Sequence, residues 1–213
     1  MSRPQVLVID SGMGNIGSVV AALQRQNCDL ERVKLPPSNA AAFTHSVLPG
    51  VGSFAAGMEA LNVSGWDAWI KEKWGPAGRP LLGICLGMQL LASEGFEGAA
   101  ADGVVQGLDL IPGKVRRLAC PPGFVLPHVG WNELHWHSHA GALADGLPDG
   151  RDFYFVHTYA FQPIDPAHSL AVCEYGERFT AVVGKGACYG VQFHPEKSQY
   201  LGFKIVRNFL TIL

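Results

Sequence analysis

Cys85 is the residue of this chain best placed to act as a nucleophile. It stands between Gly83 and Gly87, directly after the apolar run Pro80–Leu82. Glycines on both sides of a nucleophile at the end of a buried strand are typical of a sharp strand-to-helix turn, because only glycine tolerates the crowding there. A cysteine in an apolar segment is more often a core residue, but these glycines favour a reactive thiol.

Oxyanion donors are predicted on two segments next to this turn. We expect a helix over Leu86–Ala92, whose N-terminus points at the Cys85 sulfur, favours the thiolate and offers the Leu86 N–H group. The second donor must come from a separate loop, and Gly52, in the turn Pro49–Gly52, is the candidate. Removing such a donor typically costs about 2.7–4 kcal/mol of transition-state stabilisation.

A general base is predicted near the other end of the chain. His194 and Glu196 follow the apolar, strand-like run Gly190–Phe193. Acyl transfer needs a histidine that takes the thiol proton and returns it to the leaving amine, and an acid that holds the imidazole in one tautomer. His-Pro-Glu alone is usually a turn. After a strand, in a chain with a nucleophile turn, it predicts a triad of Cys85, His194 and Glu196.

Three further signals are weighed against simpler interpretations. Gly12–Gly17 fits the G-x-G-x-x-G pattern of dinucleotide-binding turns, but Lys34 and Leu35 stand where that pattern needs an acid, so a turn is favoured. The alternating histidines of 135–139 could share a strand face, but no Asp/Glu–His cluster completes a metal site. His157 ends a strand-like segment that enters a polar turn, a common place for substrate contacts.

Composition narrows the class of protein. The 213 residues, 48% of them hydrophobic, suit one domain over residues 1–213. A net charge of −2 without a basic stripe argues against nucleic acid, and no apolar run suits a membrane span or a signal segment. Five cysteines without a CxxC pair argue against disulfides and zinc. We therefore expect a soluble, cytoplasmic protein with no metal and no cofactor.

The order of apolar segments predicts an α/β fold with a mixed, mostly parallel sheet flanked by helices. Strands at 5–10, 30–34, 46–48 and directly before Cys85 alternate with helices, the first capped by Asn15 and another carrying Trp66, Trp69 and Ile70. Later short runs are expected to add antiparallel strands, at 115–118, 153–156, 170–175, 179–183 and 188–193. The chain ends in an amphipathic helix with Val206, Phe209, Leu210 and Leu213 on one face.

Several motifs together resemble one family. Pro49–Gly52, Gly83–Gln89 and Gln192–Ser198 are similar to motifs of the class I (triad-type) glutamine amidotransferases. The segments Ile9–Asn15, Leu110–Gly113, Pro127–Asn132 and Tyr154–Tyr159 resemble more specifically the glutaminase subunits of imidazole glycerol phosphate synthases, from histidine biosynthesis. The resemblance spans nearly the whole chain, and the combination is far more specific than any single motif.

The resemblance implies the single-domain class I glutamine amidotransferase fold and hydrolysis of L-glutamine to glutamate and ammonia. Cys85 would attack the side-chain amide while the N–H groups of Gly52 and Leu86 hold the oxyanion. His194 would then protonate the departing ammonia. The positions that match glutamine-binding residues of the family are Gln89, Thr158 and Tyr159.

The resemblance also implies a partner. The family forms a heterodimer with a (β/α)8-barrel cyclase subunit, which consumes the ammonia through an internal channel. The positions that match the subunit interface are Gly12, Met13, Gly14, Asn15, Trp131, Tyr154 and Lys197. To keep wasteful hydrolysis low, Pro49–Gly52 would hold its N–H turned away until the partner carries its ligand, since a peptide bond next to glycine flips at modest cost.

Departures from the family pattern leave other functions open. Ser11 stands where the subfamily more usually has an aromatic residue, and Ala92–Gly95 replaces a Phe-Glu-Ser-Ser-like run. Both are compatible with a related subunit that supplies ammonia to a different synthase, such as one that aminates a surface sugar. A stand-alone cysteine hydrolase would act without a partner. A nucleotide-binding module using Gly12–Gly17 would be indifferent to the loss of Cys85.

Overall fold

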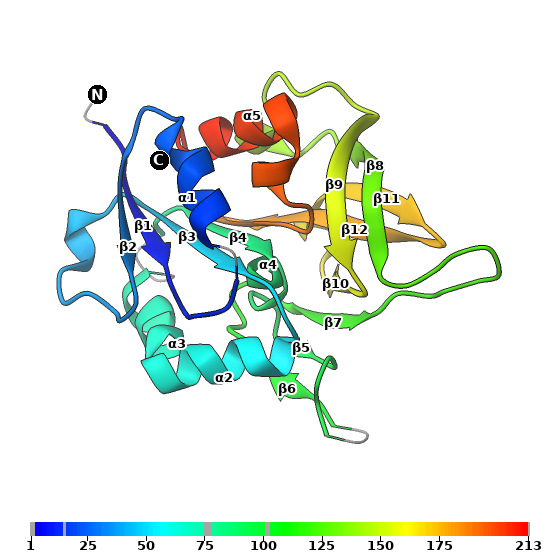
Figure 1. Cartoon of the computed structure of the whole chain (residues 1–213), viewed down its shortest axis with the longest axis horizontal. Coiled ribbons are helices and arrows are strands. Elements are labelled where there is room, and N and C mark those ends of the chain that lie inside the picture. Colours follow the sequence, from blue (N-terminus) through cyan, green and yellow to red (C-terminus); the bar gives the residue numbers. More distant parts are fainter. Residues whose placement is uncertain (1–2, 15, 75–77, 101–102, 213) are drawn as a thin grey trace.

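A large mixed sheet forms the centre of the molecule (Figure 1). The computed structural model describes residues 3–14, 16–74, 78–100 and 103–212, and within them nine strands form this sheet in the order β2-β1-β3-β4-β13-β12-β11-β8-β9. These strands are β1 (Gln5–Ile9), β2 (Asp29–Val33), β3 (His45–Gly50), β4 (Leu81–Cys85), β8 (His128–Trp136), β9 (Arg151–His157), β11 (Ser169–Tyr175), β12 (Glu177–Lys185) and β13 (Cys188–Val191). Neighbours from β2 to β13 pair in parallel, and the later strands pair antiparallel. The predicted α/β class is confirmed.

A second, smaller sheet packs beside the first and was not part of the sequence expectation. Its strand order is β10-β7-β5-β6. The strands are β5 (Glu94–Gly95), β6 (Val105–Gln106), β7 (Gly113–Arg117) and β10 (Tyr159–Pro163). The expected run 115–118 therefore lies in this sheet and not in the main one. An apolar alternation predicts a strand but does not say which sheet the strand joins.

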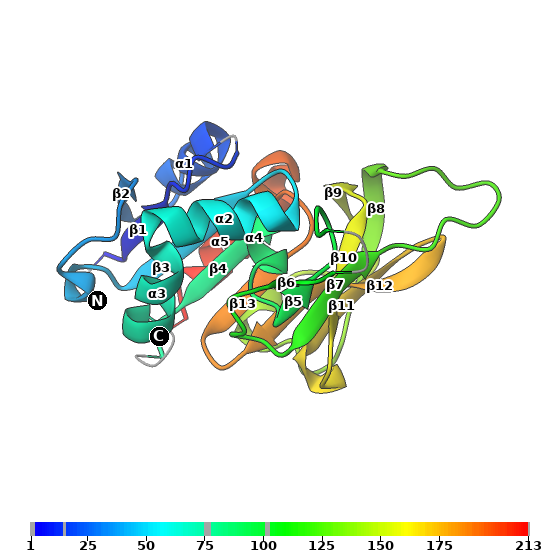
Figure 2. The same cartoon turned by 90° about the horizontal axis from the view of Figure 1, so that it is seen from below.

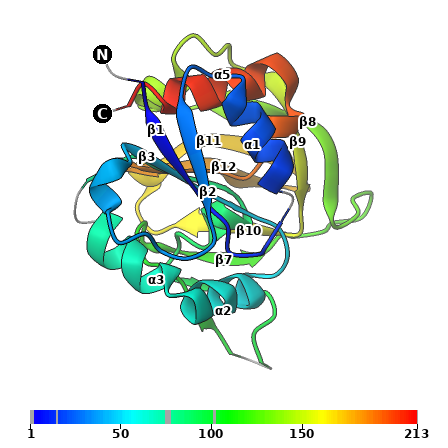
Figure 3. The same cartoon turned by 60° about the vertical axis from the view of Figure 1, so that its left-hand side comes forward.

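Helices cover both faces of the main sheet (Figures 1 and 3). On one face lie α1 (Ile16–Gln24) and α5 (Gln199–Phe209), and on the other lie α2 (Phe54–Ser64), α3 (Trp66–Trp69) and a π-helical turn (Ile70–Trp74). Short 3-10 turns lie at Ala40–Ala42, Gly141–Ala144, Pro166–His168 and Pro195–Lys197. Alternate side chains of β1 enter two cores, with Val6 on the α1 side and Leu7 on the α2 side, so both faces of the strand are apolar.

Some sequence expectations about helices need correction or lie outside the described residues. The helix after Cys85 is shorter than predicted: α4 spans Leu86–Gln89. Its last turn is tightened by bonds to carbonyl groups three residues back, from the Leu91 N–H to Met88 and from the Ala92 N–H to Gln89, so the regular helical pattern does not continue to Ala92. Val206 and Phe209 are buried in α5 as expected, whereas Asn15 and Leu213 lie outside the described residues. In the part of the chain that is described, no helix is long and apolar enough to cross a membrane.

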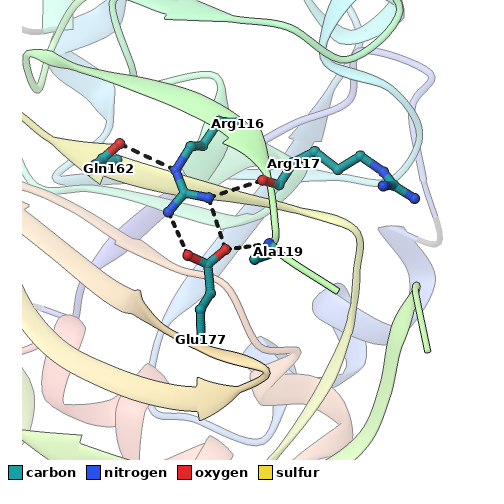
Figure 4. Close-up of polar contacts among 5 residues, drawn as sticks. All are labelled: Arg116, Arg117, Ala119, Gln162 and Glu177. Carbon is teal, nitrogen blue, oxygen red and sulfur yellow. Dashed lines mark hydrogen bonds and ion pairs between the residues drawn. The ribbon is translucent and has the colours of Figure 1, made fainter. Parts of the chain in front are cut away.

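A bidentate ion pair fastens the small sheet to the main one (Figure 4). Arg116 on β7 donates to both carboxylate oxygens of Glu177 at the start of β12, at 2.8 and 2.7 Å. The Arg116 hydrogen bond lowers the pKa of Glu177, and Arg116 also reaches Gln162 on β10. Fork-to-fork Arg–carboxylate pairs fix geometry as well as charge. The pair therefore holds β7 and β10 in place relative to the main sheet, and β10 begins at Tyr159.

The carboxyl ends of three parallel strands meet at one edge of the main sheet. β4 lies between β3 and β13, with Gly50 of β3 opposite Cys85 and Val191 of β13 opposite Ile84. Figure 2 shows α2 crossing this part of the sheet beside the small sheet. Ligands of open α/β sheets bind outside the carboxyl ends of the strands. The segments that follow β3, β4 and β13 are the ones in which the sequence predicts chemistry.

Candidate active site

The turn at Cys85 is strained. Cys85 ends β4 with φ 54° and ψ −111°, and α4 begins at the next residue. A positive φ is rare outside glycine and costs on the order of 1–3 kcal/mol, a cost that folded proteins sustain mainly at functional sites. This backbone is the sharp strand-to-helix turn that the sequence predicts.

The flanking glycines make this turn possible because there is no room for a side chain. A Cβ atom on Gly83 would lie 2.5 Å from the Gly87 carbonyl oxygen. A Cβ atom on Gly87 would lie 1.8 Å from the carbonyl oxygen of Leu48 on β3. Neither glycine has a positive φ, so crowding by the main chain, and not an unusual backbone conformation, requires glycine here.

His194 lies close to Cys85 and is held by Glu196. The His194 Nδ1 atom is 2.8 Å from Glu196 Oε1, and both side chains are about 5% exposed. Burial lowers the pKa of His194, but hydrogen bonds and charge interactions with Cys85 and Glu196 outweigh burial and raise it to about 9. The Glu196 Oε2 atom has no hydrogen-bond partner among the described residues, so its buried charge acts on His194. The pair therefore favours an imidazolium next to the sulfur.

A cavity of about 440 Å³ brings the predicted residues together. It is lined by Val51, Gly52, Ser53, Cys85, Leu86, Gln89, Glu97, Pro127, Val156, His157, Thr158, Tyr159, His194 and Lys197. Glu196 lies behind His194 and does not line it. A larger cavity of about 760 Å³ lies at the opposite end of β4, around Leu81 and Trp74, and contains none of the predicted residues.

A buried hydrogen-bond network fixes the floor of this cavity. The Tyr159 carbonyl accepts from Gln89 Nε2 at 2.9 Å and is 2.9 Å from His157 Nδ1. The other ring nitrogen of His157 lies 3.0 Å from His128 Nδ1. Burial lowers the pKa of His157 to about 3 and that of His128 to about 4, so both are neutral. Because both His157 nitrogens are taken, the side chain positions the Tyr159 carbonyl and has no nitrogen free for substrate.

Sequence reasoning missed two residues of the site. Glu97 lines the cavity, and burial raises its pKa. Gln192 is completely buried, and its side chain contacts both Gln89 and Cys85. Gln192 carried a signal, because it is a polar residue inside an otherwise apolar strand end. Glu97 carried none, since it lies in a surface-like loop after the short strand β5.

The predicted interface residues gather near the mouth of the cavity. Trp131 on β8 is 47% exposed and contacts the ring of Tyr154 edge-on at 5.8 Å. Lys197, which lines the cavity, lies over the Tyr154 ring at 5.5 Å. The Gly12–Gly14 loop packs on the Pro49–Gly52 turn, where a Cβ atom on Gly52 would lie 2.9 Å from Met13 Cε. Asn15 lies outside the described residues.

The histidines of segment 135–139 take different surroundings. His135 is the second-last residue of β8, and its Nδ1 atom lies 3.2 Å from Asp149 Oδ2. His137 and His139 stack on each other beyond the strand. Among the described residues, no three His, Cys, Asp or Glu side chains are grouped so that they could hold a metal ion.

The sequence of this chain matches a known protein family. The family model "Glutamine amidotransferase class-I" matches residues 7–213. This chain belongs to the class I glutamine amidotransferases.

Similar class I glutamine amidotransferases carry a more specific name. "Imidazole glycerol phosphate synthase subunit HisH 1" of Prochlorococcus marinus (strain MIT 9313) is 51% identical over 97% of this chain and 97% of its own length. The HisH subunit of Moorella thermoacetica is 45% identical over 97% of this chain and 94% of its own length.

Solved structures support the amidotransferase fold. A glutamine amidotransferase from Thermotoga maritima aligns with a TM-score of 0.67 at 19% identity, covering 92% of this chain and 77% of that protein. PurLQS from Thermotoga maritima aligns with a TM-score of 0.69 at 17% identity, covering 98% of each chain. At these identities the likeness concerns the fold alone.

Proposed function

We propose that this chain is the glutaminase subunit of an imidazole glycerol phosphate synthase, which hydrolyses L-glutamine and passes the ammonia to a cyclase subunit. The observation that carries the proposal is the cavity in which the strained Cys85 turn meets His194, with Glu196 behind it. The names of the relatives favour this subunit over one that serves a different synthase and over a stand-alone cysteine hydrolase.

The reaction begins with attack of the Cys85 sulfur on the side-chain amide carbon of glutamine. The thiol proton passes to His194, and the new carbon–sulfur bond places negative charge on the amide oxygen. The main-chain N–H groups of Gly52 and Leu86 are the proposed donors to this oxyanion, since both residues line the cavity beside the sulfur. The raised pKa of His194 keeps the transferred proton on the imidazole until it is needed.

Two further steps release the products. His194 gives its proton to the amide nitrogen, the carbon–nitrogen bond breaks, and ammonia leaves a thioester on Cys85. A water molecule then gives a proton to His194 as its oxygen attacks the thioester carbon, and the carbon–sulfur bond breaks to release glutamate. Glu196 stabilises the imidazolium in both steps.

Glutamine is proposed to bind along Gln89, Thr158 and Tyr159. Both N–H bonds of the Gln89 amide are already used, by the Tyr159 carbonyl and by Gln192 Oε1, so Gln89 can offer substrate only its carbonyl oxygen. The free amino acid also carries an α-ammonium group. Within the described part of the chain, Glu97 is the carboxylate that lines the cavity, and we assign it to that ammonium.

Replacing Glu97 by glutamine is expected to raise KM for glutamine at least about tenfold with a smaller change in kcat, because a hydrogen bond to a charged group is worth roughly 1.5–3 kcal/mol. Burial raises the pKa of Glu97. As the pH is lowered, KM of the parent protein should therefore begin to rise at a higher pH than it would with a carboxyl group of ordinary pKa. Steady-state kinetics against pH measure both effects. Glu59→Gln, on the exposed side of α2, is the matched control. An unchanged KM in Glu97→Gln would remove Glu97 from the substrate site.

Replacing Glu196 by glutamine is expected to move the alkaline limit of activity to lower pH. His194 must be protonated to release ammonia, so activity of the parent protein should fall as pH rises through about 9. Removing the Glu196 charge takes away one of the interactions that raise this pKa, so the fall should begin at least about one pH unit lower. Profiles of kcat between pH 6 and pH 10 test this, again with Glu59→Gln as control. If kcat of Glu196→Gln and of the parent protein fell at the same alkaline pH, the assigned pairing of Glu196 with His194 would be contradicted.

The surface around Trp131, Tyr154 and Lys197 is the proposed docking site for the cyclase. Exposed apolar side chains of Val51, Val129 and Trp131 lie on the loops and strands near the cavity. A partner that covers this surface would shield the cavity and would also press on the Gly12–Gly14 loop, which contacts Gly52. Docking is thereby connected to the proposed oxyanion donor.

The function is tested by glutamate release from glutamine, with the chain alone and with a cyclase subunit of imidazole glycerol phosphate synthase carrying its ribonucleotide substrate. We expect weak activity alone and a rise of at least about tenfold with the loaded partner, within the usual range of coupling between sites. Low activity that the cyclase does not raise would point to another synthase. Vigorous activity without any partner would point to an independent hydrolase.

A further inference from the structure

Among the residues that the structure describes, the Cys85 sulfur has two polar neighbours besides His194. The Val156 carbonyl oxygen lies 3.8 Å away, and the Gln192 Nε2 atom lies 3.8 Å away on a completely buried side chain. The carbonyl can accept the proton of a thiol but repels a thiolate. An N–H donor has the opposite preference, because it stabilises the charged form of an acceptor.

The orientation of the Gln192 amide follows from a main-chain group whose role is unambiguous. The Tyr159 carbonyl can only accept, so Gln89 must turn its NH₂ group toward it. The same NH₂ group lies 3.0 Å from Gln192 and must meet the amide oxygen there. The NH₂ group of Gln192 is therefore left on the side of the Cys85 sulfur.

The second bond to the Tyr159 carbonyl keeps this orientation in place. His157 Nδ1 lies 2.9 Å from the same oxygen, and its other nitrogen contacts His128. A neutral His157 donates to the carbonyl and accepts from His128, so every bond in the series has one consistent direction. Each of these polar side chains is less than 10% exposed, so water does not compete for the bonds.

We propose that Gln192 is a further catalytic residue, whose side-chain amide donates a hydrogen bond to the Cys85 sulfur and stabilises the thiolate. This role rests on the proposed function only in taking Cys85 as the nucleophile. His194 removes the thiol proton, and the Gln192 N–H then offsets the repulsion between the thiolate and the Val156 carbonyl. Gln89 acts through Gln192 in this respect and is a positioning residue.

The test is the rate at which iodoacetamide alkylates Cys85 at pH 7, measured by peptide mass spectrometry. Thiolates react and thiols do not, so this rate reports thiolate stability. Gln192→Met removes the donor, and Gln192→Glu keeps the shape but offers the sulfur an acceptor. Gln24→Met, on the exposed side of α1, is the control. Cys120 is exposed, so its alkylation rate is an internal reference for the activity of the reagent. Cys173 is buried, so it reacts only if the chain unfolds.

We expect both Gln192 variants to alkylate Cys85 about tenfold more slowly relative to Cys120, as loss of a hydrogen bond to a charged group requires. Gln24→Met should match the parent protein. If Cys173 is alkylated in Gln192→Met, that variant has unfolded, and the isosteric Gln192→Glu variant is then used to test the proposal. A parent rate of Cys85 alkylation in a folded Gln192 variant overturns the proposal. Alkylation needs neither glutamine nor a partner, so an error in the proposed function would appear separately, as absent glutamine hydrolysis in the parent protein.

Discussion

Replacing Cys85 by alanine is expected to reduce glutamine hydrolysis at least about 10⁴-fold, in the presence of the loaded cyclase, where the parent activity is highest. The nucleophile and its base act as a unit, so removing one member forfeits most of the benefit of the other. The oxyanion donors and the substrate contacts stay, but without the sulfur there is no thioester. A coupled assay that follows glutamate release over hours is sensitive enough to measure a loss of this size.

The control for this loss is Cys120→Ala, because Cys120 is an exposed free cysteine that does not line the cavity. It should leave hydrolysis unchanged. Binding of Cys85→Ala to the cyclase should also be unchanged, since Cys85 is 7% exposed and offers little surface to a partner. Substantial hydrolysis by Cys85→Ala would mean that another group performs the attack.

Replacing Gly87 by alanine is expected to lower the free energy of unfolding by roughly 3 kcal/mol or more. The new methyl carbon would lie 1.8 Å from the Leu48 carbonyl oxygen, and that oxygen belongs to a buried strand. Overpacking a core typically costs about 1–3 kcal/mol, and main-chain atoms of a central strand yield less than side chains do. Because β3 leads into the Pro49–Gly52 turn, activity should fall as well. Urea unfolding of the chain measures the first effect.

Gly57→Ala is the matched control for this change. Gly57 is also a buried glycine in a helix, but the atoms nearest to an added Cβ atom would be the side-chain ends of Leu86 and Leu90, at 3.1 Å. Those side chains can move, and alanine is favoured over glycine in a helix by about 1 kcal/mol. Its stability should therefore change by no more than about 1 kcal/mol. Equal destabilisation by the two substitutions would show that the contact with Leu48 is not special.

The sequence was sufficient to predict the fold class and to name the candidate residues for the chemistry. Apolar runs alternate with helices before Cys85 and follow one another closely after it, and this order predicts a mixed sheet. The glycines around Cys85 and the polar residues after Phe193 stand at strand ends, where side chains leave the core. Local patterns sufficed here because a strand end and a nucleophile turn are each built from a few consecutive residues.

The small second sheet could not be predicted in this way. Its strands β5 and β6 are two residues long, too short for any periodicity, and β7 pairs with β10 across more than forty residues. The segment that follows the helix after Cys85 bonds likewise to a distant loop, since the carbonyl groups of Leu90, Leu91 and Ala92 accept from N–H groups of residues 108–111. In both cases a distant segment supplies the hydrogen bonds, and no local pattern announces it.

The sequence by itself therefore determined which residues are proposed to carry the chemistry: Cys85, His194 and Glu196, with glycine-rich turns beside them. Only the tertiary structure decided how those groups are supported. Gln192 meets Gln89 and Cys85 across 103 and 107 positions of the chain, and Glu97 reaches the cavity from a loop with no motif. The Tyr159 carbonyl can only accept, and this fixes which group donates in the hydrogen bonds that connect Gln89, Gln192 and Cys85. Such a direction arises only when distant donors and acceptors are buried together and each must find a partner.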